Sequence, residues 1–149
     1  AEIETFLVDN AAAKDVAVGG YDAYEVSFTL KPHFEGKTKV TLCNACGEKF
    51  SLEFDTENMT VLADRSESGK MTRIKSFVLM PAAPLGLCNS SDGYDVDVFV
   101  DKCSVEVFVD GGRIAMTNLV FPTEPFDNIV FESTGESEIS NMFIHKIGK

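Results

Sequence analysis

The sequence predicts an all-β protein, an antiparallel β-sandwich of the jelly-roll or concanavalin-like type with about ten strands. Three observations predict it. Hydrophobic and polar residues alternate with a period of two along most of the chain. Clusters of Gly, Ser, Asn and Asp separate the alternating stretches at short intervals. Helical periodicity is nearly absent. A closed barrel remains the alternative, because alternation is common to both architectures.

The expected strands follow one another with a turn signal between neighbours. In 24–30 (YEVSFTL), the apolar residues from Tyr24 to Leu30 share one face and the polar residues share the other. Further strands are predicted at 49–55, 59–64, 74–80, 94–101, 104–110, 113–121, 128–133 and 139–147. Turn signals stand at 18–22, 43–49, 65–70, 89–95, 110–113 and 133–137. Only 10–16 (NAAAKDV) is compatible with a helix, and its shortness favours a loop turn.

Length and composition indicate one ordered domain covering residues 1–149. Of its 149 residues, 44% are hydrophobic, which excludes a disordered chain. The net charge of −11 argues against nucleic acid and anionic membrane surfaces as partners. No window approaches the roughly 18 continuous apolar residues of a membrane span. The first residues, AEIETFLVDN, lack the basic and apolar regions of a signal peptide and do not start with Met. We therefore expect a mature product or a piece of a longer protein.

The cysteines and histidines predict neither a metal site nor a cofactor. The chain has four cysteines, Cys43, Cys46, Cys88 and Cys103. Cys43 and Cys46 have metal-like spacing, but zinc takes four ligands and no second pair with matching spacing follows. His33 and His145 stand apart in the sequence. We expect half-buried thiols, with a bridge between Cys43 and Cys46 left open if they flank a tight turn.

The stretch 97–112 (DVFVDKCSVEVFVDGG) contains the most regular alternation in the chain. If Lys102 and Cys103 form a two-residue turn, Asp101 pairs with Ser104 and every second residue is a valine on one face. The valine face is Val96, Val98, Val100, Val105, Val107 and Val109. The opposite face, here called the acid and phenylalanine face, is Asp97, Phe99, Asp101, Ser104, Glu106, Phe108 and Asp110. Valines predict the core side, so the acid and phenylalanine face lies outside.

The acid and phenylalanine face has three possible interpretations. Phe99 and Phe108 together indicate a surface that something covers, either protein or a ligand. Carboxylates beside aromatic rings are also suited to a sugar. Asp101 and Glu106 become diagonal neighbours about 7 Å apart, a separation that glycosidase carboxyl pairs use. Such a spacing is common in hairpins, and a catalytic acid also needs burial in a cleft. No other acid–base arrangement appears in the sequence.

The segment 100–122 (VDKCSVEVFVDGGRIAMTNLVFP) resembles the C-terminal β-sandwich signature of glycoside hydrolase family 32, the invertases, levanases, inulinases and fructosyltransferases. Matching residues are Asp101, Ser104, Val105, Glu106, Val107, Phe108, Gly111, Thr117, Phe121 and Pro122. Lys102 and Cys103 replace the more common Arg and Ser. The segments ADRSESG at 63–69, APLG at 83–86 and EISNMFIHKI at 138–147 resemble further parts of the family pattern, which is clear from about residue 50 onward.

The resemblance implies a module without catalytic residues. In that family the catalytic carboxylates lie in an N-terminal propeller, and none of its three carboxylate motifs is in this sequence. The implied function is a non-catalytic module that supports the propeller of a fructan- or sucrose-hydrolysing β-fructosidase. The implied partner is that propeller, in the same polypeptide, and the implied location is secreted, periplasmic or on the cell surface. Asp101 and Glu106 would then be structural residues of the module.

The alternative is an autonomous module that binds the terminal fructose of levan or inulin, because the sandwich is similar to family 66 fructan-binding modules. The candidate sugar-binding residues are Arg65, Asp101, Glu106, Tyr94 and Arg113. The scarcity of Trp and Tyr disfavours this alternative, since sugars stack on such rings. For a docked module, Phe99 and Phe108 are the candidate interface residues.

Overall fold

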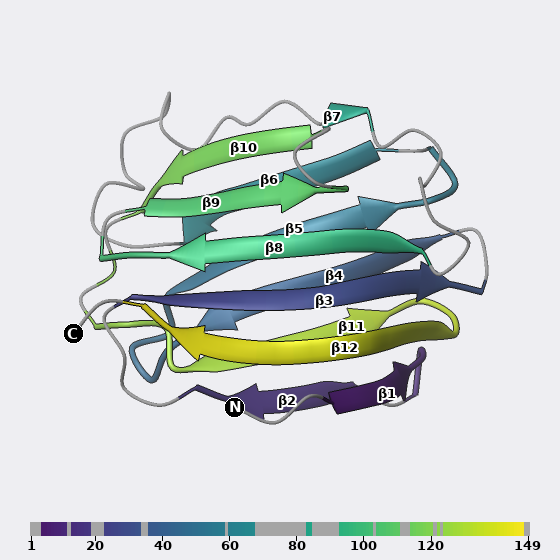
Figure 1. The fold of residues 1–149 in the computed structure, drawn as a ribbon, viewed down its shortest axis with the longest axis horizontal. Coiled ribbons are helices and arrows are strands. Elements are labelled where there is room, and N and C mark those ends of the chain that lie inside the picture. Colours follow the sequence, from purple (N-terminus) through teal and green to yellow (C-terminus); the bar gives the residue numbers. More distant parts are fainter. Residues whose placement is uncertain are drawn as a thin grey trace.

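Two antiparallel sheets of six strands each pack face to face in the computed structural model (Figure 1). The structure describes residues 4–11, 13–18, 23–33, 36–58, 60–67, 83–84, 93–102, 104–110, 114–120, 122 and 124–147. The first sheet consists, in spatial order, of β1 (Glu4–Val8), β12 (Ser137–Lys146), β3 (Tyr24–Pro32), β8 (Tyr94–Val100), β9 (Ser104–Val109) and β10 (Ile114–Leu119). The second consists of β2 (Lys14–Ala17), β11 (Asn128–Ser133), β4 (Lys37–Cys43), β5 (Lys49–Asp55), β6 (Thr60–Glu67) and β7 (Ala83–Pro84).

The predicted β-sandwich is confirmed. Each sheet has two separate edge strands among the described residues, β1 and β10 in one and β2 and β7 in the other. The alternative of a closed barrel is therefore wrong. The described part of the chain contains no helix, and hence none long and apolar enough to span a membrane.

The structure differs from the expected strands in four places. It adds β1, β2, β4 and the two-residue β7 to the expected set. The stretch 10–16, expected as a loop turn, runs from Lys14 into β2, which pairs with β11. The predicted strand at 74–80 lies outside the described residues.

The core lies between the sheets and is built from the inward side of each strand. Phe131 of β11 contacts Phe6 of β1 and Phe28 of β3 edge to face, at centroid distances of 5.2 and 5.4 Å. Such aromatic pairs contribute about 0.5–1.5 kcal/mol each beyond the area they bury. A ring from the second sheet thus connects two strands of the first.

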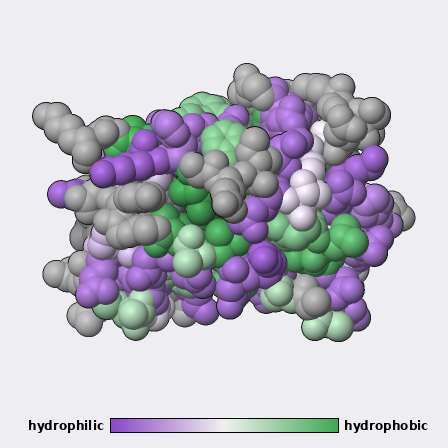
Figure 2. Space-filling view, turned by 60° about the horizontal axis from the view of Figure 1, so that its bottom comes forward, coloured by the Kyte–Doolittle hydropathy of each residue, from purple (hydrophilic) through white to green (hydrophobic). Residues whose placement is uncertain are grey.

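One side of the sandwich exposes apolar surface along its edge strands. Leu7 of β1 is 57% exposed, the largest value among the described large hydrophobic residues. The view onto the side formed by β1 and β2 shows hydrophobic side chains gathered between hydrophilic ones (Figure 2). Neighbouring Phe6 is half-buried, with the Lys14 Nζ 5.5 Å from its ring centroid.

Candidate functional site

The predicted hairpin of β8 and β9 is present with the predicted register. Val98 pairs with Val107, Phe99 with Glu106 and Asp97 with Phe108. The Asp101 amide donates to the Ser104 carbonyl oxygen at 2.9 Å, which closes the hairpin around residues 102 and 103. The register of the two strands therefore places the acid and phenylalanine face as expected.

Burial separates the two faces of the hairpin. The six valines of the inner face are at most 4% exposed. On the outer face, Phe99, Glu106 and Phe108 are half-buried and Asp101 is exposed. The Phe99 and Phe108 rings meet edge to face at 5.7 Å, with an interplanar angle of 77°. They form a compact aromatic pair on the outer surface of the first sheet.

Strands β3 and β12 extend the acid and phenylalanine face. Glu25 of β3 pairs with Phe99 on one side and with His145 of β12 on the other. Asp97 pairs with Ser27, so it is the diagonal neighbour of Glu25. A row of side chains therefore crosses the sheet from His145 through Glu25 and Phe99 to Glu106.

Glu25 of this row and Asp97 of the next row form a diagonal carboxyl pair. Burial raises the pKa of Glu25, and a hydrogen bond with Asp97 and the negative charge of Asp97 raise it further. His145 acts in the opposite direction and lowers it. The shift shows that the negative charge on Glu25 is disfavoured in this place.

Three other carboxylates near the hairpin accept local hydrogen bonds. Asp101 Oδ1 accepts the amide hydrogen of Lys102 at 2.7 Å. Asp110 Oδ1 accepts the Asp95 amide hydrogen at 3.0 Å, and Asp110 itself has a φ of +53°. Asp95 Oδ1 accepts the Thr29 hydroxyl at 3.0 Å. These three aspartates have local structural roles at the ends of the hairpin.

The described candidates for sugar binding lie on both sides of the first sheet. Glu106 and Asp101 lie on the outer side of the hairpin, as expected. Tyr94 points the other way, on the same side as the core valines, and is only 5% exposed. Arg65 belongs to β6, in the second sheet, and its side chain is outside the described part. Arg113 also lies outside the described residues.

Glu25, Asp97 and His145 were not among the predicted site residues. The alternation within 94–101 places Asp97 on the outer face, but it does not indicate which strand lies beside it. Only the pairing of β3 with β8 and β12 brings Glu25 and His145 to the same row. No group of His, Cys, Asp and Glu suited to a metal occurs among the described residues.

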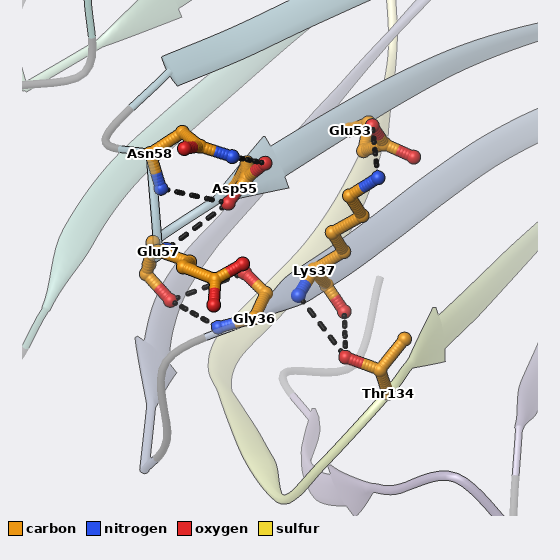
Figure 3. A network of polar contacts seen from close by, with 8 residues as sticks. Gly36, Lys37, Glu53, Asp55, Glu57, Asn58 and Thr134 are labelled. Atoms are coloured by element: carbon orange, nitrogen blue, oxygen red, sulfur yellow. Dashed lines mark hydrogen bonds and ion pairs between the residues drawn. The ribbon is translucent and has the colours of Figure 1, made fainter.

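A second polar cluster lies at one end of the second sheet and is occupied by turn contacts (Figure 3). Asp55 is 6% exposed, and its carboxylate accepts the amides of Glu57 and Asn58 at 3.0 Å and Asn58 Nδ2 at 2.9 Å. These bonds lower the pKa of Asp55. The Lys37 amide donates to Thr134 Oγ1 at 3.1 Å, and Lys37 Nζ lies 3.9 Å from Glu53 Oε2. The cluster joins neighbouring turns, so it is a structural network.

The cysteines of the CNAC stretch are separate thiols. Cys43 is half-buried and Cys46 is exposed, and both are free. Asn44 organises the turn between them, because its Oδ1 accepts the amides of Cys46 and Glu48 at 3.0 and 3.2 Å. The turn therefore forms without a disulfide.

Sequence comparisons find relatives that are much longer than this chain. The chain is 26% identical to the levanase of Bacillus subtilis over 148 residues, which is 96% of the chain and 22% of the levanase. It is 32% identical over 104 residues to a fructan beta-fructosidase of Streptococcus mutans, covering 68% of the chain and 7% of that protein. The chain thus spans less than a quarter of either relative.

The fold recurs in solved structures of similar enzymes. The exo-inulinase of Aspergillus awamori matches with a TM-score of 0.81 at 22% identity, over 99% of this chain and 29% of the inulinase. The fructofuranosidase of Schwanniomyces occidentalis matches with a TM-score of 0.77 at 17% identity, over 98% of this chain and 33% of that one. The family model "Glycosyl hydrolases family 32 C terminal" matches residues 3–146. The chain therefore belongs to the glycosyl hydrolase family 32 C-terminal domain family.

Proposed function

We propose that this chain is the C-terminal β-sandwich module of a fructosidase-type enzyme, with no catalysis of its own and a stabilising role toward the catalytic part. The observation that carries the proposal is the family match over residues 3–146, in a chain that spans only 22% of a levanase and 29% of an exo-inulinase. Most of such an enzyme lies outside the segment that this chain matches. The catalytic propeller of the same polypeptide is the proposed partner.

The surroundings of Asp101 and Glu106 favour a structural role for both. Asp101 is exposed at the end of the hairpin, and its carboxylate accepts the Lys102 amide. A glycosidase acid needs an apolar site that keeps it protonated. Glu106 lies on a sheet face beside Phe99, its direct cross-strand neighbour. This placement fits a residue that organises a surface.

The acid and phenylalanine face is the proposed contact with the catalytic part. Phe99 and Phe108 form an edge-to-face aromatic pair that is half-buried in the chain alone. Aromatic side chains are enriched in the centres of protein interfaces. Tyr94, the one described aromatic candidate for sugar stacking, is in the core. Contact with protein therefore has more structural basis than contact with fructose.

The test compares the chain with its parent polypeptide in hydrolysis assays on levan, inulin and sucrose. We expect activity from the parent and none from residues 1–149. Release of fructose by the chain alone would refute the proposal. Calorimetry of the chain with levan and fructose addresses the alternative of sugar binding. Heat of binding at millimolar sugar that is lost in Glu106→Gln, but kept in Glu132→Gln on the second sheet, would favour the alternative.

A further inference from the structure

In the register of the first sheet, no described lysine or arginine pairs with Glu25 or with Asp97. Glu25 faces Asp97 diagonally on β8 and His145 directly on β12. Glu106 lies one strand further, beyond Phe99. Among the described lysines, Lys31 pairs with Glu138 at the far end of β3, Lys102 lies in the turn of the hairpin, and Lys146 pairs with the core residue Tyr24. Among the described residues, His145 is the cation that lowers the pKa of Glu25.

The described surroundings of Glu25 and Asp97 leave the pair with an excess of negative charge. Two carboxyl groups in hydrogen-bonding contact share a proton readily, and both cannot ionise without repulsion. The raised pKa of Glu25 agrees with that arrangement. An arginine or lysine approaching the pair removes the repulsion and gains a charge-assisted contact, which for arginine can be bidentate. The net charge of −11 gives the chain an excess of acids to be matched by a basic partner.

We propose that the acid and phenylalanine face docks on a basic surface of the catalytic part, with an arginine or lysine of that part placed against Glu25 and Asp97 and apolar surface placed on Phe99 and Phe108. The inference rests on the proposed function and adds the chemistry of the partner. A cation placed against the pair favours its ionised form, so contact between the two parts strengthens as the pH rises. Acidification weakens it by protonating the pair.

The experiment measures the unfolding midpoint of the sandwich at pH 7 in two settings, residues 1–149 alone and the intact parent polypeptide. Glu25→Gln removes the repulsion in the isolated chain, so its midpoint should rise, by about 1–3 °C. In the parent the same change removes the partner of the proposed cation, so the midpoint of the sandwich should fall. Asp97→Asn should show the same reversal of sign. A change in the same direction in both settings, for both variants, would overturn the inference.

Glu132→Gln is the matched control, because Glu132 is exposed on β11 of the second sheet. The unfolding midpoint of the Glu132→Gln variant should stay unchanged in both settings. If this variant also raised the midpoint of the isolated chain and lowered that of the parent, the inference would be overturned. In the isolated chain the gain from Glu25→Gln should vanish below about pH 4.5, the ordinary pKa of the glutamate. The outcome is independent of the hydrolysis assay. Fructose release by the chain alone contradicts the proposed function, whereas a missing reversal with an inactive chain contradicts only the basic partner.

Discussion

The hydroxyl of Tyr24 donates a 2.7 Å hydrogen bond to the carbonyl oxygen of Phe126. Tyr24 begins β3 in the first sheet, and Phe126 lies just before β11 in the second. Both residues are at most 1% exposed. The bond therefore connects the two sheets through groups that have little access to water.

We expect Tyr24→Phe to lower the free energy of unfolding by about 1–3 kcal/mol, because it leaves a buried carbonyl oxygen without its donor. Burial, with smaller contributions from Asp127 and Cys43, raises the pKa of Tyr24 above its ordinary 10.0. The wild type is therefore stabilised below about pH 10 and loses that stabilisation as the pH rises through the folded pKa. Urea unfolding at pH 7 and at alkaline pH measures both effects. If the free energy of unfolding fell equally with pH in wild type and variant above pH 10, the loss would not come from the ionisation of Tyr24.

Gly93→Ala should destabilise the sandwich strongly. Gly93 has a φ of +117°, and a Cβ there would overlap the Leu30 carbonyl oxygen of the neighbouring strand. Strain and displacement together should cost about 3 kcal/mol or more. Gly47→Ala is the control, since Gly47 has a φ of +80° with nothing within 4 Å of an added Cβ. Its cost should be about 1 kcal/mol. If urea unfolding showed that both variants lose the same free energy of unfolding, the steric explanation would be refuted.

Asp55→Asn should weaken the turn that follows β5. The new amide nitrogen would face Asn58 Nδ2, another donor, and the charge that accepts the two turn amides would be lost. We expect a loss on the order of 1 kcal/mol at neutral pH. The pKa of Asp55 is lowered from 3.8, so the wild-type advantage is present above that pH and declines as the pH falls through the folded pKa. Thermal unfolding of wild type and variant from pH 7 to pH 2 measures this difference in stability. Asp15→Asn is the control, because Asp15 is exposed.

Cys46 should react with a thiol reagent faster than Cys43. Cys46 is exposed, whereas Cys43 is half-buried and its Sγ lies 3.7 Å from the Asn128 carbonyl oxygen. Timed alkylation followed by peptide mapping shows which of the two cysteines reacts first. Faster modification of Cys43, or a disulfide between the two in the chain as purified, would show that the turn differs from the one described.

Local alternation predicted the pairing of β8 with β9, its register and both of its faces. The same alternation places Tyr94 on the core side, because it has the parity of the core residues Val96 and Val98. Its side-chain chemistry suits a sugar, whereas its position in the pattern predicts burial. Periodicity therefore carried more information than residue type at this position.

The strands that were missed have weak local signals. In β4, Thr38 and Thr41 are buried among hydrophobic residues, so the apolar pattern of a strand is hidden. Thr38 Oγ1 contacts Ser137 Oγ at 2.9 Å, which satisfies its hydroxyl in the interior. In β2 the preceding alanines favour a helix locally, and pairing with β11 outweighs that preference.

The carboxyl pair could not be predicted, because it depends on contacts between distant segments. Glu25 and Asp97 are separated by about half of the chain and meet through the pairing of β3 with β8. The order of strands in the first sheet is not encoded in any short stretch. Alternation predicts the outward face of β8 and of β9, whereas the neighbours of these strands follow from the fold.

The position of β12 between β1 and β3 has a consequence for synthesis on the ribosome. The first sheet stays divided until residues 137–146 have been made, because they fill the gap between two strands made much earlier. Contacts of such large sequence separation form slowly. Until then β1 and β3 expose their unpaired edges, a state in which strands associate with other chains. A nascent chain halted before β12 is therefore prone to aggregation.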